Sequence, residues 1–314
     1  MKKFRTVFMG TPEFALPCLK ALAEHVEVIG VVTQPDRPRG RGQKLRPSPV
    51  KVFAQERGIP LYQPLKVREE AFLREMEELE PELIVVVAFG QILPKRLLEL
   101  PPMGCINVHG SLLPQYRGAA PMQWSILRGE KKTGITTMFM DVGLDTGAML
   151  LKEEIEIGED MTLSELHDAL MEMGANVLLK TLEQLSDGTL VSEPQREEDA
   201  SYAPMIKKET GKIPWEKSSK TIHDLVRGLN SWPGAYTFLG EDTYKIWKTK
   251  ILEKDSDALP GTILQADKGG LVVATGKGTL EILEMQAPGG KKMAARDYLS
   301  GHGISLPARF TMKS

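Results

Sequence analysis

The first half of this chain alternates short, almost entirely apolar runs with longer stretches of helical character. The apolar runs lie at 4–9, 26–33, 83–89, 105–109 and 134–140. The helical stretches between them open at Pro12 and recur around 50–57, 68–79 and 119–129. Strands that are apolar along their whole length are buried on both faces, which is typical of a mostly parallel sheet covered by helices. The pattern predicts a doubly wound, Rossmann-like α/β domain.

This α/β domain is predicted to continue to residue 189. We expect a strand pair around 148–157 and then a helix over 162–186, in which Thr162 is the N-cap and Glu165 completes a capping box. The polar stretch EPQREEDASYAP that follows predicts a linker between domains. The predicted organisation is an α/β domain at 1–189, a linker at 190–206 and a second domain at 207–314.

The last third of the chain has a different pattern. A helix is predicted near 218–229. Short β-like runs separated by Gly, Pro and Asp follow it at 235–239, 243–252, 261–266, 270–275 and 279–286. Several short strands at such spacing are typical of a small barrel or sandwich. We expect an OB-like β-barrel, a shape that often binds nucleic-acid backbones.

The net charge of −2 conceals a difference between the two parts of the chain. Residues 1–204 carry 23 Lys and Arg against 30 Asp and Glu, a balance of −7, whereas residues 205–314 carry 17 against 12, a balance of +5. A basic module hints at a polyanionic partner, although an excess of this size is more often an ordinary solvated surface.

Composition and motif content narrow the class of protein. Apolar residues make up 41% and charged residues 26%, as in soluble globular proteins. The longest apolar run, at 83–89, is too short to span a membrane, and no cleavable leader pattern is present, so we expect a cytoplasmic protein without a membrane partner. The two cysteines, Cys18 and Cys105, have neither metal-ligand spacing nor a disulfide framework.

Nucleotide and metal motifs are missing from the sequence. The turn after the first strand reads MGTPEF and lacks the G-x-G-x-x-G pattern of dinucleotide-binding proteins. The glycine-lysine stretches TGKGT and GGKKM lack phosphate-loop spacing. Without H-E-x-x-H or a Cys/His cluster, no protein-bound metal is expected. These absences weigh against oxidoreductases and nucleotidases.

Asn107 and His109 are polar residues in an otherwise apolar strand. Side chains two residues apart on a strand point to the same side, so the amide and the imidazole are predicted to project together near the strand's carboxyl end. In open α/β sheets the ligand crevice lies outside that end. For either residue alone a structural role is equally compatible with the sequence: Asn107 could tie down a loop and His109 could cap a helix.

A second strand end supplies carboxylates. Asp141 and Asp145 follow the strand at 134–140, and Gly143 and Gly147 allow the backbone to bend close to a ligand. A carboxylate beside an imidazole can fix the orientation of the ring. We therefore expect an Asn, His and Asp set that contains no protein nucleophile.

Such a set suits a reaction in which one substrate supplies the nucleophile and the other the acyl group. An Asn amide and a protonated His can donate hydrogen bonds to a developing oxyanion, an effect of about 2.7 to 4 kcal/mol per donor. The carboxylate can hold the imidazolium and help to remove a proton from an amine, directly or through a water. The residues indicate acyl transfer to an amine.

The stretch INVHGSLLPQYRGAAP followed by DVGLDTG closely resembles the folate-dependent formyltransferases. The resemblance implies that Asn107, His109 and Asp145 are catalytic and that the formyl donor is 10-formyltetrahydrofolate. Within that superfamily, MGTPEFA, TQPDRPRGRGQKLRPSPVK, AFGQILP, NSWPGAY and PGTI resemble the members that formylate methionyl-initiator tRNA for translation initiation. This likeness extends over essentially the whole chain.

The resemblance also implies two sets of folate contacts. The first follows the catalytic strand and comprises Ser111, Leu112, Leu113 and Pro114. The second, in AFGQILP at another strand end, comprises Phe89, Gly90, Ile92 and Leu93. For Phe89 and Leu93 an ordinary place in the core is equally compatible with the sequence. A glycine at the end of a strand, in contrast, permits the close backbone approach that a flat heterocycle requires.

A basic segment at 34–51 supports an RNA substrate, with Pro and Gly expected to prevent regular structure there. The residues predicted to bind tRNA are Arg37, Arg39, Arg41, Lys44 and Arg46. A run this basic is often merely solvated, but beside a basic second domain it fits a clamp on an acceptor stem, because phosphate contacts position a nucleic acid.

Two alternatives stay open. The first is a formyltransferase for an amino sugar nucleotide or a small ribonucleotide, which needs the same site but not the basic segment. The second is a non-catalytic RNA-binding protein on an α/β scaffold, in which the Asn, His and Asp have no role. The expected partners are initiator methionyl-tRNA and the folate, and we expect a monomer.

Overall fold

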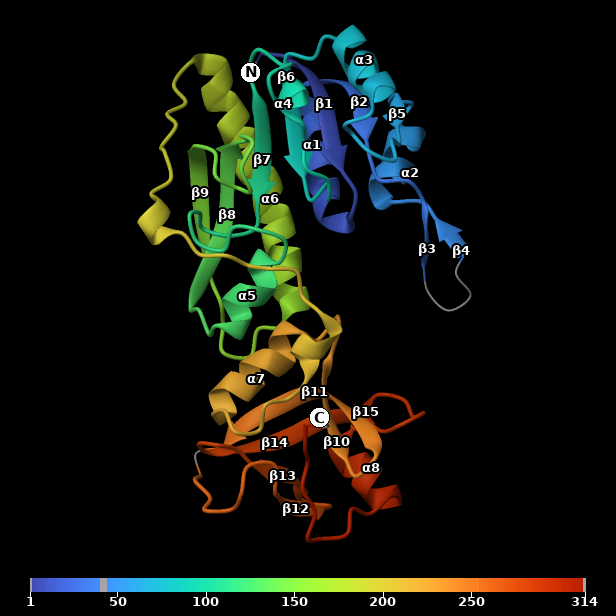
Figure 1. Cartoon of the computed structure of the whole chain (residues 1–314), viewed down its shortest axis with the longest axis vertical. Coiled ribbons are helices and arrows are strands. Elements are labelled where there is room, and N and C mark those ends of the chain that lie inside the picture. The colour runs from blue at the N-terminus through green and yellow to red at the C-terminus, as the bar shows by residue number, and fades with distance from the viewer. Residues whose placement is uncertain (1, 40–43, 253, 313–314) are drawn as a thin grey trace. The chain divides into compact units, whose positions relative to one another are not determined.

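The computed structural model describes residues 2–39, 44–252 and 254–312 (Figure 1). Contacts group the chain into two compact units. The first unit comprises Met1–Pro121, Thr133–Ile155 and His167–Ala203, and the second comprises Met122–Lys132, Glu156–Leu166 and Pro204–Ser314. The domain boundaries predicted at residues 189 and 206 stay a prediction.

The first unit is built on a seven-stranded sheet with the order β5-β2-β1-β6-β7-β8-β9. Its strands are β1 (Arg5–Gly10), β2 (Glu27–Val32), β5 (Leu61–Tyr62), β6 (Leu83–Val87), β7 (Cys105–His109), β8 (Lys132–Phe139) and β9 (Met149–Glu156). The pairs from β5 through β7 are parallel, whereas β8 runs antiparallel to β7. The predicted doubly wound, mostly parallel sheet is confirmed.

Helices connect these strands. They are α1 (Leu16–His25) after the 3-10 turn η1 (Glu13–Ala15), α2 (Pro49–Glu56), α3 (Glu70–Glu78), α4 (Lys95–Leu98), α5 (Pro121–Leu127) and α6 (Leu163–Asp187). The capping box predicted for α6 is present, because Thr162 N and Oγ1 both donate to Glu165 Oε2, at 2.8 and 2.9 Å. Within the described part of the chain, no helix has the length and apolar character needed to cross a membrane.

Helices cover both faces of the sheet. On one face, Gly174 of α6 lies against Val108 of β7 and Ile135 of β8. On the other face, a buried cluster joins side chains of α3, α4 and the sheet, among them Phe72, Leu97 and Cys105. Odd-numbered residues of β7 therefore share the face of Cys105, which places Asn107 and His109 on the α3 and α4 side.

The strand order reverses between β1 and β6, where the chain leaves β1 toward β2 on one side and later adds β6 on the other. Such a topological switch point opens a crevice at the carboxyl ends of the strands. The segments leaving β1, β2 and β6 contribute Thr11, Gln34 and Gly90 to a hollow at this point. The sheet itself thus places a cavity at the carboxyl ends of β1, β2 and β6, of which β6 is the strand that pairs with β7.

The second unit contains α7 (Ser219–Gly228) and an antiparallel sheet with the order β10-β11-β14-β13-β12. Its elements are β10 (Ala235–Leu239), β11 (Asp242–Leu252), β12 (Ile263–Asp267), β13 (Gly270–Ala274), β14 (Thr279–Gln286), β15 (Met293–Ala294) and α8 (Ala295–Gly301). The strands fall close to the predicted runs, and the predicted second β domain is confirmed.

The C-terminal segment joins the two edges of this sheet. Phe238 of β10 and Thr311 exchange backbone hydrogen bonds of 3.1 and 2.9 Å. At the other edge, Ile263 N of β12 donates to the carbonyl of Ala308 at 2.9 Å. Paired edges remove the unsatisfied backbone groups that an open sheet exposes, and the result is a barrel-like closure. Phe310 of the same segment is buried in the core of this unit.

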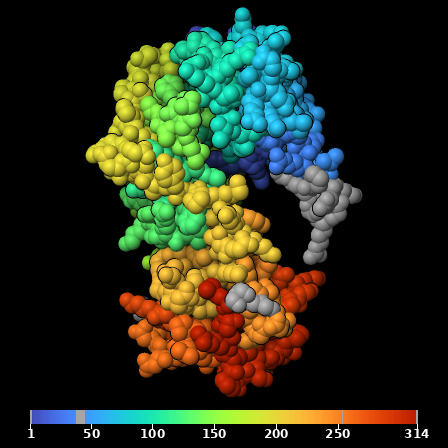
Figure 2. All heavy atoms as spheres, viewed as in Figure 1, coloured from blue at the N-terminus to red at the C-terminus, as the bar shows by residue number. Residues whose placement is uncertain are grey.

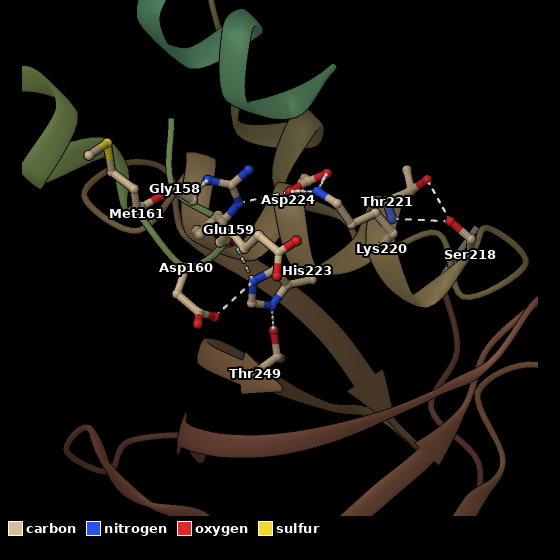
Figure 3. Close-up of polar contacts among 11 residues, drawn as sticks. Gly158, Glu159, Asp160, Met161, Ser218, Lys220, Thr221, His223, Asp224 and Thr249 are labelled. Atoms are coloured by element: carbon tan, nitrogen blue, oxygen red, sulfur yellow. Dashed lines mark hydrogen bonds and ion pairs between the residues drawn. The ribbon is translucent and has the colours of Figure 1, made fainter. Parts of the chain in front are cut away.

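A buried ion pair explains why residues 156–166 belong to the second unit. Arg227 Nη1 of α7 donates to the carbonyls of Gly158 and Met161, at 3.1 and 2.8 Å, and Arg227 Nε donates to Asp224 Oδ1 at 2.8 Å. Figure 3 shows Asp224 of α7 beside Gly158 and Met161 of the stretch that precedes α6. The guanidinium satisfies carbonyl oxygens that have no place in a helix or strand.

Two local predictions were wrong. The strand pair expected around 148–157 is one strand, β9, which pairs with β8. The basic segment, expected to be irregular, contains the hairpin β3 (Arg37–Arg39) and β4 (Lys44–Arg46), in which Arg37 lies opposite Arg46. A two-stranded ribbon tolerates a proline because the missing donor can face away from the partner strand.

Candidate active site

Asn107 and His109 lie at the carboxyl end of β7, and both are buried. His109 Nε2 is 3.0 Å from the carbonyl oxygen of Tyr116. A carbonyl can only accept, so Nε2 carries a hydrogen and the ring orientation is set by the loop after β7. The Asn107 side chain has no hydrogen-bond partner among the described residues, which leaves its amide available to a ligand.

Asp145 completes the predicted trio. Its Oδ2 lies 3.6 Å from His109 Nδ1 and accepts a hydrogen bond of 2.8 Å from the backbone N of Gly118. Both ring nitrogens of His109 thus face oxygen atoms, Tyr116 O on one side and the carboxylate on the other.

The loop after β8 brings Asp145 to His109. Because β8 is antiparallel to β7, its carboxyl end lies beside the start of β7, with Phe139 opposite Ile106. The loop after β8 then folds back to the end of β7. Asp141, the other predicted carboxylate, caps this loop by accepting from Gly143 N at 2.9 Å and from Thr146 Oγ1 at 2.6 Å.

The two cysteine thiols of the chain are poor nucleophiles. The thiol of Cys105 lies on the same strand as Asn107 and His109, but burial raises its pKa to about 12. The thiol of Cys18 is also buried, and burial, with a smaller contribution from Glu172, raises its pKa to about 12 as well. Thiols with such pKa values stay protonated at neutral pH and react poorly. The chemistry therefore suits attack by a nucleophile that a substrate brings.

The residues of AFGQILP divide into core and surface. Phe89 and Leu93 are buried in the cluster between the sheet and α3. An ordinary place in the core was one of the two roles that the sequence left open for them. Ile92 is 82% exposed. Gly90 has φ +84°, and an added Cβ would meet no atom within 4 Å. The backbone at Gly90 is thus open to a flat ligand, which fits the predicted folate contact.

The segment Ser111–Pro114 is mostly held by the protein itself. Ser111 is fully buried, and its hydroxyl donates to the carbonyl of Gln115 at 2.7 Å. Leu113 packs in a small buried cluster with Met138. Leu112 and Pro114 are half-buried. Their role as folate contacts stays a prediction.

The basic hairpin borders the crevice at the switch point. Arg37 and Arg46 line a hollow of about 190 Å³, which we call the strand-end hollow, together with Thr11, Gln34, Ser48 and Gly90. Gln34 Oε1 accepts from Arg37 Nη2 at 3.3 Å. Of the other predicted tRNA contacts, Arg41 lies outside the described residues, and only the backbone of Arg39 and Lys44 is described.

The acidic residue of the basic segment is neutralised locally. Asp36 Oδ2 accepts from Lys51 Nζ at 2.7 Å, and Asp36 Oδ1 accepts from Gln63 Nε2 at 3.1 Å. These hydrogen bonds lower the pKa of the Asp36 carboxyl. Asp36 is therefore not a free negative charge beside Arg37 and Arg46.

Across the described chain, no group of three His, Cys, Asp or Glu side chains could hold a metal ion.

Two residues with no predicted role are linked to Asp145: Gln195 bonds its backbone, and Arg117 bonds Gln195. Gln195 Nε2 donates to the carbonyls of Asp145 and Gly147, at 2.7 and 2.8 Å, and Arg117 Nε donates to Gln195 Oε1 at 2.9 Å. Gln195 lies in the predicted linker, where the polar composition indicated exposure to solvent. No local pattern relates it to a loop 50 positions earlier in the chain.

Two family models match most of the chain. Residues 4–182 match the model described as "Formyl transferase", and residues 205–303 match "Formyl transferase, C-terminal domain". The methionyl-tRNA formyltransferase of Clostridioides difficile is 52% identical over 301 residues, which are 96% of this chain and 97% of that protein. The protein of the same name from Caldanaerobacter subterraneus subsp. tengcongensis is 53% identical over 302 residues, 96% of this chain and 97% of its own length.

Solved structures with much lower sequence identity share the fold. The N-formyltransferase from Helicobacter canadensis, in complex with folinic acid and dTDP-3-aminofucose, has a TM-score of 0.69 at 19% identity and covers 89% of this chain and 98% of its own. HypX from Aquifex aeolicus in complex with tetrahydrofolic acid has a TM-score of 0.63 at 17% identity and covers 96% of this chain and 48% of its own.

Proposed function

The chain belongs to the formyl transferase family, and we propose that it transfers the formyl group of 10-formyltetrahydrofolate to the amino group of methionyl-initiator tRNA. The support for this substrate pair is the identity of 52% and 53%, over 96% of this chain, with two relatives named methionyl-tRNA formyltransferase. The observation that carries the chemistry is the 3.6 Å approach of Asp145 to His109 at the end of β7.

Asn107 and His109 are proposed to stabilise the oxyanion that develops on the formyl oxygen. The free amide of Asn107 and the Nδ1–H of His109 are the proposed donors, on the same face of β7. Nε2 is already bonded to Tyr116 O, whereas Nδ1 lies 3.6 Å from Asp145 Oδ2, which is beyond hydrogen-bond distance. Both are buried, so they act where little water competes for the oxyanion. When bound, the folate supplies the formyl carbon that the amine attacks.

Asp145 is proposed to orient the His109 ring and to receive a proton from the attacking amine, directly or through a water. Its Oδ2 already accepts from Gly118 N at 2.8 Å, which fixes the carboxylate, while Oδ1 is left for the amine or a water. As the new N–C bond forms, the bond between the formyl carbon and N10 of the folate breaks. The amine loses this proton, and N10 gains one. Atoms and charge therefore balance over the reaction.

The folate is proposed to bind at the carboxyl ends of β6 and β7. Gly90 supports this position, because its open backbone lies at the end of β6. The predicted contacts Ile92, Leu112 and Pro114 are exposed or half-buried and can meet a ligand. Phe89, Leu93, Ser111 and Leu113 are buried and would support the pocket from behind.

The acceptor end of the tRNA is proposed to meet the basic hairpin, where Arg37 and Arg46 line the strand-end hollow. Arg39, Arg41 and Lys44 belong to the same proposed contact. The second unit is proposed to bind the body of the tRNA through its net positive charge. One chain supplies the whole trio, so we propose that the enzyme works as a monomer. We also propose that it acts in the cytoplasm and uses no metal.

A formyl-transfer assay with labelled donor tests this function. The acceptors are methionyl-initiator tRNA, free methionine and a dTDP-linked amino sugar. We expect efficient transfer to the charged tRNA and at least a hundredfold lower kcat/KM for the other two acceptors. Preferred transfer to the amino sugar would overturn the tRNA assignment, and no transfer to any acceptor would leave only a binding function.

A further inference from the structure

The most buried charge of the first unit lies beside the proposed site and has no part in the chemistry described above. Arg117 is 1% exposed and is one of the largest fully buried side chains in the described protein. We propose that Arg117 and Gln195 are positioning residues that hold Asp145 beside His109. This inference rests on the proposed function of the trio and adds two residues to it.

Gln195 acts on the backbone of the Asp145 loop. Its Nε2 donates to two carbonyl oxygens of this loop, those of Asp145 and Gly147, at 2.7 and 2.8 Å. Each of the two amide hydrogens therefore has one acceptor, and the amide can rotate very little. A side chain that bridges two carbonyls two residues apart fixes the turn between them.

Asp145 needs such support because of its backbone conformation. It has φ +54°, in the left-handed region that residues other than glycine adopt at a cost and that aspartate tolerates better than most. Glycines flank this turn at 143 and 147. Surrounding contacts must therefore specify the conformation, and the bridge from Gln195 supplies two of them. The hydrogen bond from Gly118 N to the carboxylate supplies a third.

Arg117 in turn fixes Gln195. Arg117 Nε donates to Gln195 Oε1 at 2.9 Å, which leaves Nε2 of the amide as the end that faces the loop. Arg117 Nη1 pairs with Glu197 at 2.7 Å. Burial of a guanidinium costs free energy unless the group is paired and hydrogen-bonded, so Arg117 needs Gln195 and Glu197 as partners. Arg117 and Gly118 are adjacent, so one short segment both fixes Gln195, which bonds the Asp145 backbone, and donates to the Asp145 carboxylate.

The segment that carries Gln195 is bound along the loop after β7. Arg117 N donates to Ser201 O and accepts at its own carbonyl from Ala203 N, both at 2.8 Å. Tyr116 N donates to Ser201 Oγ at 2.9 Å, and Tyr116 is also the residue whose carbonyl faces His109. In Figure 2 the yellow atoms of the segment around residue 200 form part of the surface, beside green atoms from earlier in the chain. The docked segment thus supports both partners of the His109 ring.

The test compares two matched variants in adjacent positions. Gln195→Met keeps the size of the side chain and removes both donors. Arg196→Ala is the control, because Arg196 pairs only with exposed acidic residues of its own segment, Glu198 and Asp199. We expect Gln195→Met to lower kcat at least tenfold, to change the KM for folate and tRNA less than twofold, and to leave folate-analogue binding intact. The control should match the original protein.

A double-variant cycle separates positioning from general stability. If Gln195 acts through the carboxylate of Asp145, Gln195→Met should lower kcat less than twofold in an Asp145→Asn background. A full tenfold loss in that background would overturn the proposal, because it would show an effect that does not pass through Asp145. Asn is used at 145 because it tolerates the left-handed conformation.

A second variant keeps the test valid if Gln195→Met does not fold. Arg117→Lys retains the charge but replaces two separate donor nitrogens, Nε toward Gln195 and Nη1 toward Glu197, with one ammonium nitrogen. We expect it to lower kcat severalfold without raising the KM for folate. Unchanged kcat in both folded variants would overturn the positioning role. If Asp145→Asn itself is fully active, the proposed catalytic trio fails, and that result is distinguishable because it does not involve Gln195.

Discussion

The two units hold their polar groups in different ways. In the first unit the polar groups gather at the carboxyl ends of a mostly parallel sheet, and every proposed catalytic residue lies there. In the second unit an antiparallel sheet with joined edges carries a net positive charge and no member of the trio. Chemistry needs side chains fixed against each other, whereas binding of a polyanion needs charge over an area. The comparison predicts that kcat and the use of tRNA can be changed separately.

The tryptophans make this separation measurable. All four of them, Trp124, Trp215, Trp232 and Trp247, belong to the second unit. Intrinsic fluorescence therefore reports on the second unit, while binding of a folate analogue reports on the first. Each variant below can be assigned to one unit by these two signals.

The largest effect is expected from the trio. Asn107→Ala, His109→Ala and Asp145→Asn should each lower turnover roughly 100-fold or more, because each removes a group that acts on the oxyanion or on the amine proton. Folate-analogue binding and tryptophan fluorescence should stay close to those of the original protein. Near-normal turnover in one variant would remove that residue from the mechanism.

The shared face of Asn107 and His109 could be predicted because it follows from the local alternation of side chains along one strand. Alternating side chains of a strand place them on one face, and the structure places them at its carboxyl end. The position of Asp145 depends on the direction of β8, which the sequence leaves open. The connection from β7 to β8 contains α5, and a helix between strands is typical of a parallel crossover. Residues 122–132, with most of α5, group instead with the second unit, and β8 returns antiparallel.

The sequence could not predict Gln195 or the hairpin. Gln195 acts through contacts 48 and 50 positions away, and neither its type nor its neighbours carry a periodic signal. The hairpin β3–β4 is three residues per strand, too short for alternation to stand out. In both cases tertiary contacts decide a structure that local propensity leaves open.

A smaller effect is expected from the strand-end hollow. The double variant Arg37→Ala with Arg46→Ala should raise the KM for tRNA about tenfold and leave kcat and the KM for folate within twofold. Each lost phosphate contact should also lower the slope of log affinity against log salt by about one unit. Lys20→Ala, an exposed lysine of α1, is the control. A higher KM for folate instead would assign the two arginines to the carboxylates of the folate tail.

The second unit offers a milder test of its proposed role. A hollow of about 390 Å³ at the start of α7 is lined by Lys220, Lys254 and Lys277, with Asp255 at its side. Lys254→Glu and Lys277→Glu should each raise the KM for tRNA severalfold with kcat unchanged, because phosphate contacts add affinity without touching the reacting atoms. Lys268→Glu, in the turn between β12 and β13, is the control. An equal change in the control would mean that only net charge matters.

The smallest effect is expected from His223, the buried histidine of the second unit. Its Nδ1 lies 3.0 Å from Thr249 Oγ1, and its Nε2 lies 3.2 Å from the carbonyl of Glu159 and 3.3 Å from Asp160 Oδ1 (Figure 3). Burial lowers the pKa of His223 and outweighs the opposing effects of the Glu159 carbonyl, Asp160 and Asp224, while Arg227 lowers it further. The folded second unit therefore disfavours the protonated ring.

Linkage turns this lowered pKa into a stability difference. The unfolded chain, with an ordinary histidine pKa near 6.5, binds a proton before the folded chain does, so stability present above that pH is lost as the pH falls below it. The loss should grow as the pH falls from 6.5 toward 5.5. Urea unfolding followed by tryptophan fluorescence at pH 7.5 and 5.5 should show a smaller loss in His223→Gln than in the original protein. The exposed His302→Gln should behave like the original protein, and the same loss in all three proteins would assign the acid sensitivity to other groups.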